Sequence, residues 1–232
     1  MSKIIPLLLI FTIIIITTGP AHAHKLITHD GTHTDFDSAL YIPNHRISWA
    51  IYDNLDANGV KFYTFEAKHG DPFYASILIP KINGLEEYSP SLFLVSPAGV
   101  ENSIALLEIG PNVEEFPYNG DFPGNEFYEP FGQVTYWKRQ EVTTNIPIDG
   151  QYYVVVADEG VGGRYALSIG TIEDFSGENF LLTLPMAWFE TKLFVNDYLS
   201  MGILFSVLAT PAGVAFIIIQ RRLRKNTSKN LA

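Results

Sequence analysis

Histidines near the amino terminus are the residues whose types and spacing best fit chemistry. Four of the six histidines fall within residues 22–33, in the stretch HAHKLITHDGTH. If the mature chain begins at His24, that residue carries both a free α-amine and an imidazole, and His29 or His33 supplies a second imidazole. Three nitrogen ligands of this kind favour Cu(II). An exported copper-binding protein is therefore one hypothesis, and adventitious binding by a flexible His-rich segment is its alternative.

Whether His24 is the first residue depends on how the amino terminus is processed. Residues 1–23 contain an early Lys3, a largely apolar core over 4–16, a Gly-Pro break and then Ala21-His22-Ala23. This pattern is typical of a secretory signal peptide that is cleaved after its last small residue. An uncleaved anchor is the alternative, and it would remove the free amine from the copper site.

A second apolar block lies near the carboxyl terminus. Residues 199–219 carry no charge and are long enough to cross a hydrocarbon layer of about 30 Å at about 1.5 Å per residue. Basic residues follow at once in 220–232, and the positive-inside rule places this tail in the cytoplasm. The sequence thus predicts a single-pass cell-membrane protein with its amino-terminal part outside. A buried core helix is the alternative.

The part between the two apolar blocks is strongly acidic. All 25 acidic residues lie within 24–198, together with nine of the 15 Lys and Arg residues, which leaves a net charge of about −16. Such a charge repels a phosphate backbone, so nucleic acid is not expected as a partner. The chain has no Cys, which excludes disulfides, thiolate metal sites and cysteine nucleophiles.

Apolar and polar residues alternate from residue 48 to residue 170, between turns rich in Gly, Pro, Asn and Asp. This alternation predicts antiparallel strands. The expected strands are 48–55, 60–68, 72–80, 91–95, 103–109, 134–137, 140–146, 151–158 and 163–170. Short strands at this spacing predict an all-β fold, an antiparallel β-sandwich or jelly roll over 48–170.

The flanking segments lack the strand pattern. Residues 24–47 are interpreted as a His-rich leader without a rigid scaffold. Residues 171–198 are interpreted as a juxtamembrane connector. Its aromatic residues either sit at the level of the lipid headgroups or pack back on the sandwich.

Three stretches, taken in order, resemble the pre-peptidase C-terminal (PPC-like) domains of bacteria and archaea. They are FYTFEAKHGDPFYASILIP (62–80), PSLFLVSPAG (90–99) and IPIDGQYYVVVADEGVGGRYALSIG (146–170). The resemblance covers 48–170, with 110–133 as a long insertion. It implies a jelly-roll-like sandwich of the kind that serves as an accessory module outside the cell, and some family members bind calcium or polymeric ligands. Because no peptidase accompanies the module, we expect it to stand alone on a membrane anchor.

The insertion 110–133 is the longest expected loop, and long loops on a rigid frame often carry function. Its aromatic residues could supply contact area for a partner: Phe116, Tyr118, Phe122, Phe127, Tyr128 and Phe131. The alternative is that these side chains are buried and keep the loop packed against the rest of the domain.

Acidic loops offer a possible calcium site, because calcium takes six to eight oxygen ligands. Two clusters qualify by composition: Asp53, Asp56 and Asn58 at one hairpin end, and Asp121, Asn125, Glu126 and Glu129 in the long loop. Neither fits the EF-hand spacing, and solvated acidic turns are the alternative.

No motif in the sequence predicts catalysis. It contains no G-x-S-x-G, H-E-x-x-H or P-loop pattern. A Ser-His-Asp triad built on His69 is conceivable, but nothing in the spacing favours it, and a surface histidine in a turn is the simpler interpretation. The leading interpretation is therefore a non-catalytic membrane-anchored module without a cofactor. It would bind a surface polymer, a partner protein or a neighbouring complex.

Overall fold

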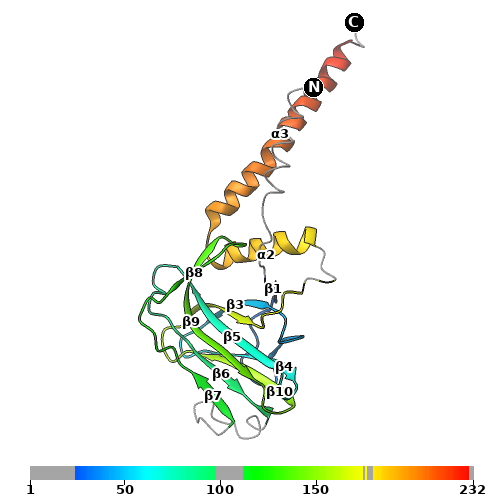
Figure 1. Ribbon diagram of the computed structural model, residues 1–232. Coiled ribbons are helices and arrows are strands. Elements are labelled where there is room, and N and C mark those ends of the chain that lie inside the picture. Colours follow the sequence, from blue (N-terminus) through cyan, green and yellow to red (C-terminus); the bar gives the residue numbers. More distant parts are fainter. Residues whose placement is uncertain (1–23, 98–111, 175, 177–179, 230–232) are drawn as a thin grey trace. The chain divides into compact units, whose positions relative to one another are not determined.

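A computed structural model describes residues 24–97, 112–174, 176 and 180–229 (Figure 1). These residues divide into two compact units, 1–179 and 180–232. The predicted signal peptide and the predicted strand at 103–109 lie outside the described residues.

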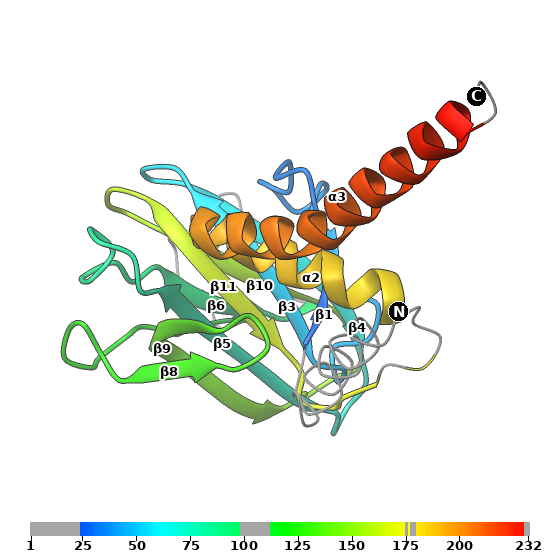
Figure 2. The ribbon, with the colours of Figure 1, turned by 90° about the horizontal axis from the view of Figure 1, so that it is seen from above.

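The first unit is a β-sandwich, as the alternation predicts. Within the described residues, one sheet (sheet A) has six strands in the order β1 (Lys25–Leu26), β3 (Trp49–Leu55), β11 (Gly163–Ile169), β5 (Pro72–Pro80), β9 (Val134–Asn145) and β8 (Glu126–Glu129). The other (sheet B) has five, in the order β2 (Leu40–Tyr41), β4 (Val60–Ala67), β10 (Gly150–Ala157), β6 (Ser91–Val95) and β7 (Val113–Phe116). Figures 1 and 2 show the two layers from two directions. The all-β prediction is confirmed.

The main core lies between the two sheets. Alternate residues of each strand point inward, so that Ile51 and Leu167 of sheet A meet Phe65 and Val154 of sheet B in one buried cluster. Burial of such side chains contributes about 1.5–3 kcal/mol each. The core therefore rests on the same period-2 alternation that the sequence displays.

The outer face of sheet B is also apolar, and the amino-terminal segment helps to cover it. Phe62, Tyr153 and Val155 form a second buried cluster on that face. The ring of Phe36 packs edge-on against Phe62 and Tyr153, with centroids 4.8 and 4.9 Å apart. The segment 24–47 is thus part of the sandwich, not a loose leader.

Two short strands fasten this segment to both sheets. β1 pairs in parallel with β3, and β2 pairs in parallel with β4. The chain between them also contacts β4, where the amide of Phe62 donates to the carbonyl of His33 over 2.9 Å. The segment therefore crosses from sheet A to sheet B on the side where β3 and β4 lie. Two-residue strands are too short to show periodicity, so the sequence did not reveal them.

Other differences from the expected strands concern the long insertion and β9. The insertion 110–133 contains β7 and β8, one at the edge of each sheet. The two strands expected at 134–137 and 140–146 form the single strand β9. Its register against β5 shifts between Ser76 and Leu78, and such a bulge changes the phase of the alternation along the strand.

The second unit contains two helices, α2 (Phe180–Phe194) and α3 (Tyr198–Lys229). Asp197 caps α3 by accepting from the amide of Ser200 over 3.1 Å, and it also pairs with Lys192 over 2.7 Å. The predicted span 199–219 lies within α3, and its positions 211, 212, 214 and 215 are outside the residues whose side chains are described. Among the described residues, no helix has both the length and the apolar character that a membrane crossing requires.

Candidate functional site

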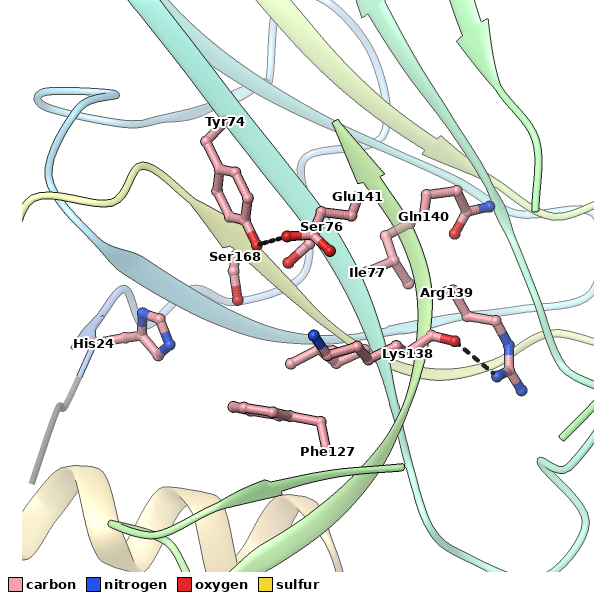
Figure 3. A pocket seen from close by; sticks show the side chains of 11 residues that line it. His24, Tyr74, Ser76, Ile77, Phe127, Lys138, Arg139, Gln140, Glu141 and Ser168 are labelled. Carbon is pink, nitrogen blue, oxygen red and sulfur yellow. Dashed lines mark hydrogen bonds between the residues drawn. The ribbon is translucent and has the colours of Figure 1, made fainter. Parts of the chain in front are cut away.

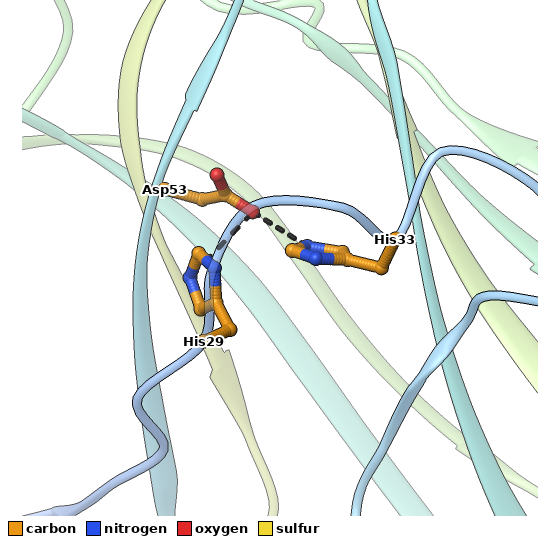
Figure 4. A group of neighbouring side chains, drawn as sticks. All are labelled: His29, His33 and Asp53. Atoms are coloured by element: carbon orange, nitrogen blue, oxygen red, sulfur yellow. Dashed lines mark hydrogen bonds and ion pairs between the residues drawn. The ribbon is translucent and has the colours of Figure 1, made fainter.

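Two of the amino-terminal histidines meet an aspartate in the interior of the sandwich. His29 and His33 come from the segment between β1 and β2, and Asp53 comes from the inward face of β3 (Figure 4). Nε2 of His33 lies 2.8 Å from Asp53 Oδ2, and Nε2 of His29 lies 3.8 Å from the same oxygen. The two imidazole rings are 4.7 Å apart in an edge-on arrangement.

Tyrosines of both sheets complete this cluster. The hydroxyl of Tyr63 on β4 donates to Asp53 Oδ2 over 2.7 Å and lies 2.6 Å from the hydroxyl of Tyr165 on β11. The amide of Asn54 donates to the other oxygen of Asp53 over 2.7 Å. Because the Tyr63 hydroxyl has only one proton, it accepts from Tyr165. A single chain of hydrogen bonds thus joins His33, β3, β4 and β11.

The cluster is buried, so its electrostatics depend on these contacts. Asp53 is only 7% exposed and Tyr63 is fully buried. Burial alone would raise the pKa of Asp53, but hydrogen bonds from His33 and Tyr63 outweigh it and lower that pKa below its ordinary value. Burial raises the pKa of Tyr63 well above its ordinary value. The site therefore holds an ionised carboxylate beside a neutral phenol.

One nitrogen of the His29 ring has a hydrogen-bond partner and the other has none among the described residues. Its Nε2 contacts the carbonyl of Tyr52 over 3.0 Å. Since a carbonyl only accepts, Nε2 carries the proton in this arrangement. Its Nδ1 is buried and has no hydrogen-bond partner among the described residues. A buried polar atom without a partner costs about 1–3 kcal/mol, so protein atoms alone leave this ring incomplete.

His24 lies elsewhere. Its Nδ1 contacts Ser48 Oγ over 2.5 Å, whereas His29 contacts the carbonyl of Tyr52. Ser48 and Tyr52 are four residues apart, which corresponds to about 13 Å in an extended chain. The copper hypothesis requires His24 to lie beside His29 or His33, and the structure does not bring these residues together. Burial lowers the pKa of His24.

The surroundings of His24 form a shallow pocket on sheet A. Figure 3 shows its ring facing the same space as Tyr74, Phe127 and Lys138. The volume is about 150 Å³. The hydroxyl of Tyr74 donates to Glu141 over 3.2 Å, so the polar groups at this end are paired with each other.

The aromatic residues of the insertion divide into packed and exposed groups. Phe116 packs against the main core, in line with the burial alternative. Tyr118 flanks the guanidinium of Arg139, and Phe127 faces the ammonium of Lys138 at 5.5 Å. Exposed fractions are 48% for Phe122 and 58% for Tyr128, whereas Phe131 is half-buried.

The acidic clusters do not form the calcium sites that their composition suggested. Asp53 points inward to His33 and Tyr63, away from the exposed Asp56 and Asn58. In the insertion, both oxygens of Glu129 accept from backbone amides of its own turn, and Glu126 pairs with Lys81. Asp121 and Asn125 are both exposed, and the backbone carbonyl of Asn125 accepts from the amide of Lys138. His69 is exposed, and its ring contacts the carbonyl of Pro147.

Sequence reasoning identified His29 and His33 but missed the residue that joins them. The sequence places Asp53 in a possible acidic turn because Asp56 and Asn58 follow it. One signal could have corrected this reading: in the alternation of 48–55, Asp53 falls on the same face as Ile51 and Leu55. An acidic residue at an inward position needs buried partners.

Comparisons with known proteins give a fold likeness only. No protein-family model matches the sequence, and no curated protein matches it. Seventeen solved chains match. Among them are two PliG proteins and one pre-peptidase C-terminal domain. PliG of Aeromonas hydrophila, a periplasmic lysozyme inhibitor of g-type lysozyme, is 15% identical with a TM-score of 0.34 over 57% of this chain and 96% of that one. PliG of Salmonella Typhimurium is 12% identical, with a TM-score of 0.33 over 57% and 97%. The pre-peptidase C-terminal domain of a Bacillus anthracis collagenase is 18% identical, with a TM-score of 0.31 over 56% and 91%.

A pre-peptidase C-terminal domain is thus among the similar solved structures. At these identities and TM-scores, the assignment to the β-sandwich class rests on the two sheets themselves.

Proposed function

We propose that this protein is a non-catalytic, membrane-anchored module whose β-sandwich binds a partner protein outside the cell. The binding surface is formed by the loop 117–125 and strand β8, which we call the β8 edge. The observation that carries the proposal is a pair of exposed aromatic side chains, Phe122 and Tyr128, on a loop and strand that are held in place by a buried arginine.

Arg139 of β9 fixes the loop to the frame. It is 5% exposed, and its guanidinium donates to the carbonyls of Tyr88, Glu86 and Pro123 over 2.9, 2.9 and 2.6 Å. The rings of Tyr118 and Phe122 lie 5.1 and 5.2 Å from the guanidinium carbon. Charge-assisted hydrogen bonds and cation–π contacts of this kind hold a loop in one conformation.

A prearranged surface binds more tightly than a mobile one, because less conformational entropy is lost on association. Aromatic residues are enriched at the centres of protein interfaces. β8 is also the outer strand of sheet A in the described residues, with β9 as its neighbour, and such an edge can accept a further strand. The acidic exported part, at about −16, favours a basic partner.

The anchoring part of the proposal is supported by the sequence. Residues 199–219 carry no charge, and a basic cluster follows them. Residues 1–23 have the pattern of an export signal. Extraction of native membranes with alkaline carbonate tests the anchor: we expect the full chain to stay with the lipid, and its release into the wash would refute anchoring.

The binding surface is tested by crosslinking in native membranes followed by pull-down of the full chain. The double variant Phe122→Ser, Tyr128→Ser should lose the crosslinked protein that the wild type captures. Tyr41→Ser is the matched control, because Tyr41 is equally exposed, at 55%, but lies on β2 of the other sheet. Equal capture by all three proteins would reject the β8 edge. Capture of a polysaccharide in place of a protein would reject the partner class.

A further inference from the structure

We infer that His29, His33 and Asp53 form a binding site for a divalent transition-metal ion of the Zn²⁺ or Cu²⁺ class. Its role would be to fasten the amino-terminal segment to the sandwich. The site differs from the amino-terminal copper site that the sequence suggested, because it excludes His24 and includes a carboxylate from β3. It is also independent of the β8 edge, so either proposal can fail alone.

The donor set suits this class of ion. Imidazole nitrogens bind Zn²⁺ and Cu²⁺ well, and two histidines with one carboxylate are a recurrent ligand set that leaves further positions open. One ligand atom from each of the three residues lies within 4.8 Å of the others. Alkaline-earth ions prefer oxygen ligands and are disfavoured by two imidazoles.

The distances require only small side-chain movements. Bonds of about 2.0–2.2 Å to one tetrahedral ion place neighbouring ligand atoms about 3.3–3.6 Å apart. The His33–Asp53 distance of 2.8 Å lies below that range, and the His29–Asp53 distance of 3.8 Å lies above it. All three ligand atoms lie within 4.8 Å of one another, so the two imidazoles have to approach each other when an ion binds. An ion bound through Nε2 of His29 takes the place of the proton there and of its hydrogen bond to the Tyr52 carbonyl, and in the neutral imidazole the remaining proton lies on Nδ1.

The carboxylate of Asp53 is held by hydrogen bonds from neighbouring groups, as the carboxylate of a metal ligand commonly is. Tyr63 and the amide of Asn54 donate to its two oxygens, and such partners orient a ligand and tune its basicity. The side chains of His29, His33 and Asp53 are 10%, 3% and 4% exposed. In this low-dielectric setting the carboxylate attracts a cation strongly.

The incomplete ring of His29 is the second observation. A histidine that served only to close the sandwich would be expected to use both nitrogens, as buried polar groups generally do. Instead Nδ1 is buried without a partner among the described residues, and Nε2 is placed between the Tyr52 carbonyl and Asp53. The ring of His29 therefore has an unsatisfied buried nitrogen, and its other nitrogen lies beside the carboxylate of Asp53.

An ion at this place would act on the fold. His29 and His33 lie on the chain that crosses from β1 to β2, and Asp53 is anchored in β3. One ion would thus join the crossing segment to sheet A, beside the tyrosines that reach sheet B. A ligand that binds only the folded state raises its stability in proportion to the logarithm of the ligand concentration.

Calorimetric titration of the full chain with Zn²⁺, after removal of metal with a chelator, tests the inference. We expect one equivalent to bind and the Tm to rise with Zn²⁺ concentration. His29→Ala should weaken binding by more than tenfold and abolish the Tm rise. This variant removes the most exposed of the three side chains, at 10%, so its Tm without metal should stay close to that of the wild type.

Two controls separate this site from other histidine sites. His24→Ala and His69→Ala should bind Zn²⁺ as the wild type does, and loss of binding in His24→Ala would assign the ion to the amino terminus and overturn the inference. Cu²⁺ added to the wild type should give an electron paramagnetic resonance spectrum with nitrogen hyperfine coupling that changes in His29→Ala. No saturable binding, or equal binding by His29→Ala, would also overturn it.

Discussion

Removal of the Tyr63 hydroxyl tests the hydrogen-bond chain that joins the two sheets. Tyr63 is fully buried, and its hydroxyl donates to Asp53 over 2.7 Å and accepts from Tyr165 over 2.6 Å. A hydrogen bond to a charged group contributes about 1.5–3 kcal/mol, and one between neutral groups about 1 kcal/mol. Tyr63→Phe should therefore lower the free energy of unfolding by about 2.5–4 kcal/mol, because Asp53 and Tyr165 each lose a partner.

Tyr88→Phe is the matched control. Tyr88 is also buried, but its hydroxyl has no hydrogen-bond partner among the described residues. Loss of an unpaired buried hydroxyl should leave stability unchanged or raise it. Urea unfolding of the full chain, followed by circular dichroism, gives both values from the midpoints at unchanged slope. If Tyr63→Phe falls within about 0.5 kcal/mol of Tyr88→Phe, the chain of hydrogen bonds does not stabilise the fold.

A pH effect and a backbone effect are also expected. Burial lowers the pKa of His45 below its ordinary value of 6.5. The unfolded chain therefore binds more protons than the folded chain as the pH drops below 6.5, and the free energy of unfolding decreases there. Between about pH 7 and about pH 5, the free energy of unfolding should decrease less in His45→Phe than in the wild type. This variant keeps a ring against Phe65. An equal decrease in the two proteins would contradict this cause. Gly162→Ala should lower the Tm more than Gly84→Ala. Both positions have a positive φ, 75° and 93°, but only a Cβ at Gly162 meets backbone atoms, those of Leu55 and its neighbours. Equal Tm losses would argue against the close approach.

Most strands of the sandwich could be predicted because alternation is a local property. β5 and β6 match the expected ranges, and β3, β4, β10 and β11 differ from them by a residue or two. The sequence predicts two strands in place of β9 because Lys138 and Arg139 interrupt the apolar pattern, and Arg139 is buried in the structure. That charge is satisfied by carbonyls of another loop, and such partners leave no trace in the local sequence.

The amino-terminal segment shows the limit of local pattern. Its apolar residues are sparse, and its two strands have only two residues each. What holds it is long-range: Phe36 rests on the outer face of sheet B, and His33 reaches a carboxylate in β3. The sequence therefore predicted a loose leader where the structure has a part of the sandwich.

The sequence by itself determined the class of fold and the candidate ligands. Period-2 alternation, turn residues, the two apolar blocks and the histidine count can all be read within short windows. Only the tertiary structure decided which candidates meet. His33 and Asp53 are 20 residues apart, and Tyr63 and Tyr165 are 102 apart. The physical reason is that these contacts depend on the order of strands across two sheets, which buries a carboxylate beside two imidazoles and leaves His24 at a different place.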